Sequence, residues 1–249
     1  MATYDRDAVV EAMTALYQTV LLMGDVPISE LTTPPDGWIP PAGIKKSAAV
    51  IDLMAHLPYH SDTYLVVETS PINYLAPNWT DGRWIPFDPW GIKRTYPIPE
   101  EYGGRPADIT EDEVAITMQK YNLGKLTILD TKTGMVRIVA DTMSQTECQV
   151  HGAHACPHHL CRHAVSRSTE SRPVLDVLRE WRQKYLDLDW MVDCCGPPDV
   201  TGDDWHDEEL LDRMRSIYRA HGWPHEYSAR ECRDALEDLR YREDEYESN

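Results

Sequence analysis

Hydrophobic residues recur at spacings of three and four near the start of the chain, which is the pattern of an amphipathic helix. Between residues 7 and 22 this apolar stripe consists of Val9, Met13, Leu16, Tyr17, Val20 and Leu21. We expect Gly24 to end that helix. A shorter helix is predicted behind Ser47, a favoured N-cap, and Pro58 ends it because proline lacks a backbone donor. Its predicted inner face consists of Val50, Ile51, Met54 and Leu57.

The middle of the chain carries strand and loop patterns. Residues 125–140 alternate between apolar and polar side chains around the turn sequence Thr131-Lys132-Thr133-Gly134, which predicts a β-hairpin. The β-formers from Tyr64 to Glu68 predict a further strand, and Trp84 to Phe87 predict a short one. The proline-rich run from Thr32 to Gly43 predicts a surface loop.

Three helices are predicted in the last third of the chain. The first has Pro173 in its first turn and an apolar stripe formed by Val174, Leu178, Trp181, Tyr185 and Leu188. The second begins behind Asp203 or Asp204 as a cap and stops at Gly222. The third begins at Ser228, which has the capping-box spacing to Glu231, and the charged tail, residues 242–249 above all, is expected to fray.

These patterns together predict an α+β fold. We expect one domain spanning residues 1–249, with a small antiparallel sheet built on the hairpin at 125–140 and a helical C-terminal third. A long loop at 144–172, which lacks apolar periodicity, separates the hairpin from these helices.

The formal net charge of −18 disfavours general nucleic-acid binding, because such a chain repels polyanions on average. The N-terminus lacks the basic and apolar regions of a signal peptide, and no segment approaches the roughly 18 apolar residues of a membrane span. We therefore expect a cytoplasmic protein with no membrane partner, in which cysteines stay reduced.

The run from Cys148 to His163 holds three of the six cysteines and five of the ten histidines. Thiolate and imidazole are the ligands that zinc prefers, and a bound ion orders a loop that has little apolar content. The density of Cys and His predicts a structural zinc site, although their spacing matches no zinc-finger pattern, and the alternative is a His-rich loop that binds metal only adventitiously. The site would use a subset of Cys148, His151, His154, Cys156, His158, Cys161 and His163.

The acidic run from Asp203 to Glu209 is the second candidate site. Carboxylates at a helix start interact favourably with the helix dipole, so capping alone is one interpretation. If the helix begins at Asp204, then Asp207 and Glu208 lie at spacings of three and four from it and converge on one side. Such carboxylates bind a guanidinium, coordinate Mg²⁺ or act as a general acid/base pair.

The sequence Asp203-Asp204-Trp205-His206-Asp207, together with the chain's size and acidity, resembles the fungal arginine-containing cyclodipeptide synthases. Their associated motif is D-D-x-x-E, and here the fifth position is Asp207 with Glu208 one place later. The resemblance implies an enzyme of secondary metabolism that condenses arginyl-tRNA with a second aminoacyl-tRNA into a cyclo(Arg-Xaa) diketopiperazine. It implies that Asp203, Asp204, Asp207 and Glu208 are catalytic, and that no cofactor is required because aminoacyl esters are already activated.

Binding of tRNA would require a local basic patch on this acidic chain. The candidate patches are Arg213, Arg215 and Arg219, or Arg179, Arg182 and Lys184.

A second resemblance points to a different class of function. The N-terminal helix, the loop around Trp38 and the Gly134 hairpin resemble Smi1/Knr4-like domains, which are α+β folds associated with protein binding and toxin immunity. This resemblance implies a metal-stabilised interaction module with a protein partner and no catalytic residue.

Overall fold

The computed structural model describes residues 4–33, 46–60, 69–72, 110–118, 126–139, 171–192 and 208–247. In these residues the helices are α1 (Arg6–Met23), η1 (Ile28–Glu30, a 3-10 helix), α2 (Ala48–His56), α4 (Val174–Asp187), α5 (Glu208–Ala220) and α6 (Ala229–Glu247). The strands are β1 (Leu31–Thr32), β2 (Tyr59–His60), β3 (Ser70–Pro71), β4 (Glu113–Met118), β5 (Leu126–Asp130), β6 (Met135–Val139) and β7 (Arg172–Pro173).

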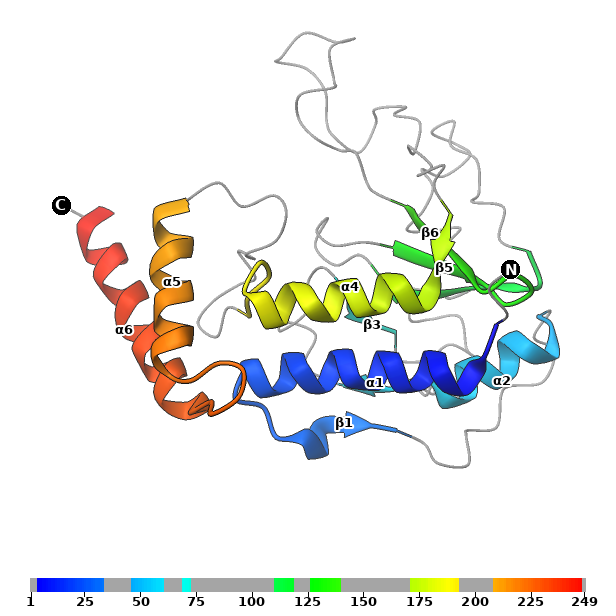
Figure 1. Cartoon of the computed structure of the whole chain (residues 1–249), viewed down its shortest axis with the longest axis horizontal. Coiled ribbons are helices and arrows are strands. Elements are labelled where there is room, and N and C mark those ends of the chain that lie inside the picture. Colours follow the sequence, from blue (N-terminus) through cyan, green and yellow to red (C-terminus); the bar gives the residue numbers. More distant parts are fainter. Residues whose placement is uncertain are drawn as a thin grey trace, which may run out of the picture.

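The strands form two antiparallel sheets. β1 pairs with β2, and a second sheet has the order β3-β4-β5-β6-β7. Helices α1 and α4 lie side by side, and α5 and α6 stand together across one end of that pair (Figure 1). The protein thus has the predicted α+β fold, with the hairpin formed by β5 and β6 and a helical C-terminal third.

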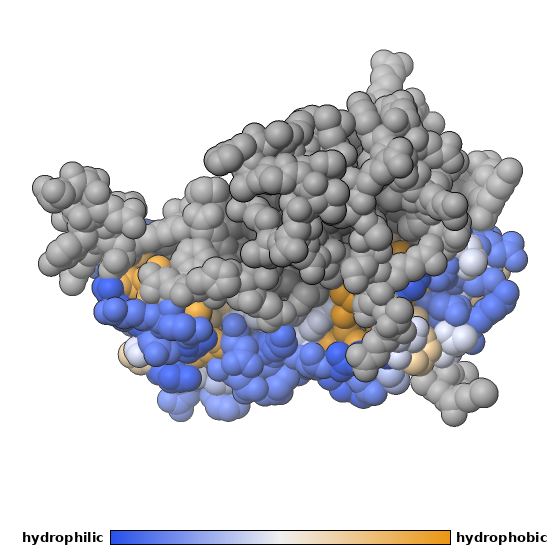
Figure 2. Space-filling view, turned by 90° about the horizontal axis from the view of Figure 1, so that it is seen from above, coloured by the Kyte–Doolittle hydropathy of each residue, from blue (hydrophilic) through white to orange (hydrophobic). Residues whose placement is uncertain are grey.

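Helix α1 provides the centre of the core. Val9, Leu16, Tyr17 and Val20 of its apolar stripe are fully buried. They belong to one cluster that also contains side chains from α2, the large sheet, α4, α5 and α6. The part of the outer surface that Figure 2 colours is mostly hydrophilic, with small apolar areas.

The predicted Gly24 end of α1 and Ser47 cap of α2 are confirmed, whereas the Asp5 cap of α1 was not predicted. The Asp5 carboxylate accepts a hydrogen bond from the Ala8 amide at the start of α1, and the Ser47 hydroxyl accepts one from the Val50 amide at the start of α2. The predicted inner face of α2 was partly wrong, because Ile51 is only half-buried and Leu53 is fully buried.

Several short strands were not predicted. β1, β2, β3 and β7 have two residues each, which is too short for a period-2 pattern to appear. β7 also changes the role of Pro173, which pairs with Met135 and directly precedes α4 instead of lying in its first turn. The Gly134 carbonyl, at the hairpin turn, accepts a hydrogen bond from the Val174 amide and so joins the hairpin to α4.

The tail that was expected to fray, residues 242–249, is helical as far as Glu247, where α6 ends. The tail is rich in Glu and Arg, which lose little side-chain freedom in a helix and have high helix propensity. The predicted strands at 64–68 and 84–87 lie outside the described residues, as do positions 34–43 of the proline-rich loop.

Aromatic side chains attach the C-terminal helices to the rest of the protein. The buried hydroxyl of Tyr218 donates to the Val192 carbonyl at 2.8 Å, and the Tyr227 hydroxyl donates to the Met23 carbonyl at 2.9 Å. The Trp223 indole Nε1 donates to the Tyr185 carbonyl at 3.2 Å. Among the described residues, no helix combines the length and the apolar character that a membrane crossing requires.

Gly222 ends α5 in a conformation that only glycine adopts easily, with φ of +84°. An added Cβ there would lie 2.2 Å from the Glu226 carbonyl oxygen. We expect Gly222→Ala to lower the free energy of unfolding by about 2 kcal/mol or more, measured by urea denaturation. Gly24→Ala is the matched control, since Gly24 has a negative φ of −85°, and an equal loss in both variants would contradict this assignment.

Lys132 donates a hydrogen bond to the Asp112 carboxylate, and this contact holds the pKa of Asp112 below its ordinary value. A carboxyl with a depressed folded-state pKa stabilises the protein above its unfolded pKa, about 4, and loses that contribution as the pH falls through the folded value. We therefore expect Asp112→Asn to lower the urea midpoint at neutral pH and to match the unmodified protein more closely in acid.

Lys132→Gln removes the other partner of the same pair, so it should reproduce this pH profile. A constant difference between variant and unmodified protein from about pH 7 to about pH 3 would show that the ion pair does not cause the effect.

Candidate functional site

The acidic start of α5 is the part of the candidate catalytic motif that the structure describes. Glu208 is the first residue of α5, and Glu209 follows it in the same turn. Asp203, Asp204 and Asp207 lie outside the described residues, and so does the helix cap predicted at Asp203 or Asp204. Of the four predicted catalytic residues, the structure therefore locates Glu208.

The amphipathic sequence of α5 determines which of its residues face solvent. Leu211, Met214 and Tyr218 are buried at spacings of three and four and attach the helix to the core. The acidic residues occupy the other faces, where the N-terminal end of the helix dipole favours negative charge.

Arg215 lies between two of these carboxylates on one side of α5. Its Nη1 is 2.8 Å from Asp212 Oδ1 and 3.6 Å from Glu208 Oε2. Its Nε donates to the Leu188 carbonyl at 3.2 Å. The side chains of Glu208 and Asp212 are 77% and 75% exposed, whereas that of Arg215 is 21% exposed. The carboxylates are thus open to solvent, and the guanidinium between them is largely covered.

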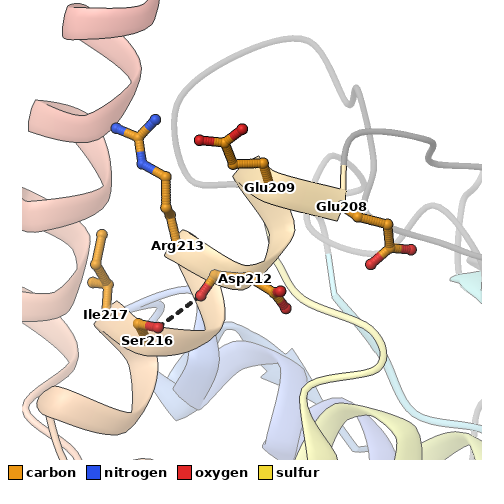
Figure 3. A pocket seen from close by; sticks show the side chains of 6 residues that line it. All are labelled: Glu208, Glu209, Asp212, Arg213, Ser216 and Ile217. Atoms are coloured by element: carbon orange, nitrogen blue, oxygen red, sulfur yellow. Dashed lines mark hydrogen bonds between the residues drawn. The ribbon is translucent and has the colours of Figure 1, made fainter.

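An open hollow of about 610 Å³ runs along α5. The described residues that line it are Glu208, Glu209, Asp212, Arg213, Ser216 and Ile217. In Figure 3, Glu209 and Arg213 project from one side of the helix and Glu208 projects from the other, while the Ser216 hydroxyl donates to the Asp212 carbonyl at 2.7 Å.

This arrangement is suited to binding a cation. Carboxylates hold a planar guanidinium through charge-assisted hydrogen bonds, and Asp212 already does so with Arg215. The ion pair between Asp212 and Arg215 was not predicted from the sequence. Arg215 was instead assigned to a basic patch. Their spacing of three within a helix was the available signal.

The proposed basic patches contain residues that contact the protein itself. Arg179 lies 3.3 Å from the Asp176 carboxylate, Arg182 donates to the Thr19 hydroxyl at 3.0 Å, and Lys184 Nζ lies 4.5 Å from the centroid of the Trp190 ring. Arg213 and Arg219 are exposed on α5. Arg213 lines the same hollow as Glu208 and Glu209, and Arg219 lies in the last turn of α5.

The predicted zinc ligands between Cys148 and His163 lie outside the described residues. Within the described part of the chain, no group of three or more His, Cys, Asp and Glu side chains has the geometry of a metal site. Cys232 of α6 is buried, and burial raises the pKa of its thiol, so this cysteine acts as a small apolar residue of the core.

Comparisons with protein-family models, curated proteins and solved structures gave no match to this chain. Two features therefore bear on function. They are the chemistry of the acidic start of α5 and the resemblance of the preceding sequence, Asp203 to Asp207, to a cyclodipeptide synthase motif.

Proposed function

We propose that this chain is a tRNA-dependent cyclodipeptide synthase that condenses arginyl-tRNA with a second aminoacyl-tRNA into a cyclo(Arg-Xaa) diketopiperazine. The observation that supports the proposal is the exposed acidic start of α5, where Asp212 and Glu208 lie 2.8 Å and 3.6 Å from the guanidinium of Arg215. The same chemistry would recognise the guanidinium of an arginyl substrate.

The proposed roles follow from what carboxylates do near an aminoacyl ester. One or two of Asp203, Asp204, Asp207 and Glu208 hold the arginyl guanidinium, and another accepts the proton that the attacking α-amino group loses. Each attack by an α-amino group on an ester carbonyl forms an amide bond and releases the tRNA hydroxyl. Two such steps close the diketopiperazine ring, and the ester supplies the driving force without a bound energy source.

The tRNA partner requires a positive surface on a chain with a net charge of −18. Arg213 and Arg219 are exposed on α5, on the helix that carries the acidic start. In this proposal they contact the phosphates of the acceptor stem while the carboxylates contact the aminoacyl group.

Expression in bacteria followed by mass spectrometry of the medium tests the enzyme proposal. We expect arginine-containing diketopiperazines from the unmodified chain and a loss of at least about a hundredfold from Asp204→Ala and Glu208→Gln, since removal of an acid/base group typically costs this much. Glu237→Gln, a carboxylate paired with Arg233 on α6, is the control that keeps full activity.

Absence of product from purified protein supplied with charged tRNAs, including arginyl-tRNA, would overturn the enzyme proposal. So would equal activity in Asp204→Ala and the unmodified chain.

The alternative function is a metal-stabilised protein-interaction or immunity-type module. It is favoured by the contacts of the basic side chains, because Arg182, Lys184 and Arg215 are all held within the protein and the net charge repels polyanions. An acidic surface of this kind suits a basic protein partner.

Metal content tests the interaction module directly. We expect about one zinc ion per chain in protein purified without chelator, and we expect zinc to be lost when residues 148–163 are replaced by a Gly/Ser linker. Under this alternative, Asp204→Ala binds the partner normally and the linker variant does not. Zinc far below stoichiometric amounts would remove the structural metal site.

A further inference from the structure

A fully buried hydroxyl lies in the second strand of the predicted β4–β5–β6 meander. Thr127 of β5 has no exposed surface, and among the described residues its Oγ1 has no hydrogen-bond partner. Removing a hydroxyl from water without giving it a partner raises the free energy of the folded state, and buried polar atoms are therefore nearly always hydrogen-bonded. The Thr127 hydroxyl calls for a partner beyond the described side chains.

Other buried threonines in the described segments show how such a hydroxyl is normally satisfied. The Thr19 hydroxyl donates to the Ala15 carbonyl, and the Thr131 hydroxyl donates to the Asp112 carbonyl, both at 2.9 Å. Thr69, which directly precedes β3, has a buried hydroxyl in the same condition as Thr127. Thr127 is the better defined of these two, because its pairing with both β4 and β6 is described.

The backbone opposite Thr127 is irregular as well. In the register between β4 and β5, Ala115 pairs with Ile128, and the next pair is Thr117 with Thr127. Ile116 is therefore an extra residue with no counterpart in β5, which is a β-bulge, and a bulge interrupts the regular ladder of hydrogen bonds. Ile116 is only 1% exposed, so the backbone at the bulge is shielded from bulk solvent together with the Thr127 hydroxyl.

A water molecule has the chemistry that this place requires. Water donates and accepts hydrogen bonds, so one molecule can serve a hydroxyl and a backbone group at once, and a buried water typically makes about three such bonds. The cross-strand neighbours of Thr127 are Thr117 in β4 and Ile138 in β6, and both are uncharged. These neighbours suit a neutral ligand and would not stabilise an ion.

We propose that the β-bulge at Ile116 is a binding site for one internal water molecule, which is hydrogen-bonded to the Thr127 hydroxyl and to the backbone at the bulge. The water completes the β4–β5 ladder where the extra residue interrupts it. The competing assignment is that the hydroxyl stays without a partner in the folded protein. The site is independent of the proposed enzymatic and interaction functions, because it involves none of their residues.

The two assignments predict opposite effects of removing the hydroxyl. Valine has nearly the shape of threonine, with a methyl group in place of the hydroxyl. If the hydroxyl is bonded to a bound water, Thr127→Val loses that bond and raises the unfolding equilibrium constant by about fivefold, measured by urea denaturation. If the hydroxyl has no partner, the variant removes an unsatisfied polar group, and an unchanged or lower constant overturns the proposal.

Thr131→Val is the matched control, because the Thr131 hydroxyl is also buried and its partner, the Asp112 carbonyl, is a protein group. We expect Thr131→Val to raise the unfolding equilibrium constant by a similar factor. A loss in Thr131→Val without a loss in Thr127→Val would show that the Thr127 hydroxyl has no partner and would overturn the proposal.

A count of internal water molecules tests the site directly. Relaxation dispersion of the oxygen-17 nucleus of water detects molecules that stay inside a protein longer than the protein takes to tumble. We expect Thr127→Val to hold about one such molecule fewer than the unmodified chain, and Thr131→Val to keep the full number. Equal numbers in Thr127→Val and the unmodified chain would contradict a water bound to this hydroxyl.

The site can also be tested without any substitution, so the test holds even if Thr127→Val does not fold. In the unmodified chain, the backbone amide of Ile116 should show direct magnetisation transfer from a long-lived water molecule in a water-selective NMR experiment. The Val136 amide, in a regular part of the β5–β6 ladder, is the control that should show none. Absence of transfer to the Ile116 amide would overturn the proposal.

Discussion

The burial of α1 is the constraint on which the rest of the structure depends. Its apolar stripe packs against α4 and contributes fully buried side chains to the one cluster that links the described elements. Each such side chain stabilises the fold by about 1.5–3 kcal/mol relative to an exposed one. The polar groups of α1 also form long-range contacts, since the Tyr17 hydroxyl donates to the Thr69 carbonyl and the Thr19 hydroxyl accepts from Arg182.

The position of α5 follows from this core. Met23, at the end of α1, accepts a hydrogen bond through its carbonyl from Tyr227, and its sulfur accepts one from the Val192 amide. Tyr218 then attaches α5 to Val192. Buried aromatic residues with polar ends suit these junctions, because the ring fills apolar space while the hydroxyl satisfies a carbonyl. The acidic start of α5 therefore lies at the solvent-facing end of a helix whose other end is firmly attached.

The candidate site divides into a part that local sequence reveals and a part that it does not. Glu208 was predicted from its place in an acidic run at a helix start, and it is the first described residue of α5. Asp212 and Arg215 were not assigned to the site, although their charges are visible in the sequence. Arg215 also donates to the Leu188 carbonyl, which is contributed by a different helix end. No periodicity within α5 contains that information.

The sequence by itself determined the helices, the Ser47 cap of α2, the β5–β6 hairpin and the acidic character of the chain, because each depends on residues within a few positions of one another. Tertiary structure decided the two-residue strands, the burial of Leu53 in place of Ile51, and the partners of the basic residues. These features depend on which surfaces meet after the chain has folded, and the residues that meet are as far apart as Thr19 and Arg182. Arg215 shows the difference most clearly, since its spacing from Asp212 is visible in the sequence and only the tertiary structure shows that its Nε donates to the Leu188 carbonyl.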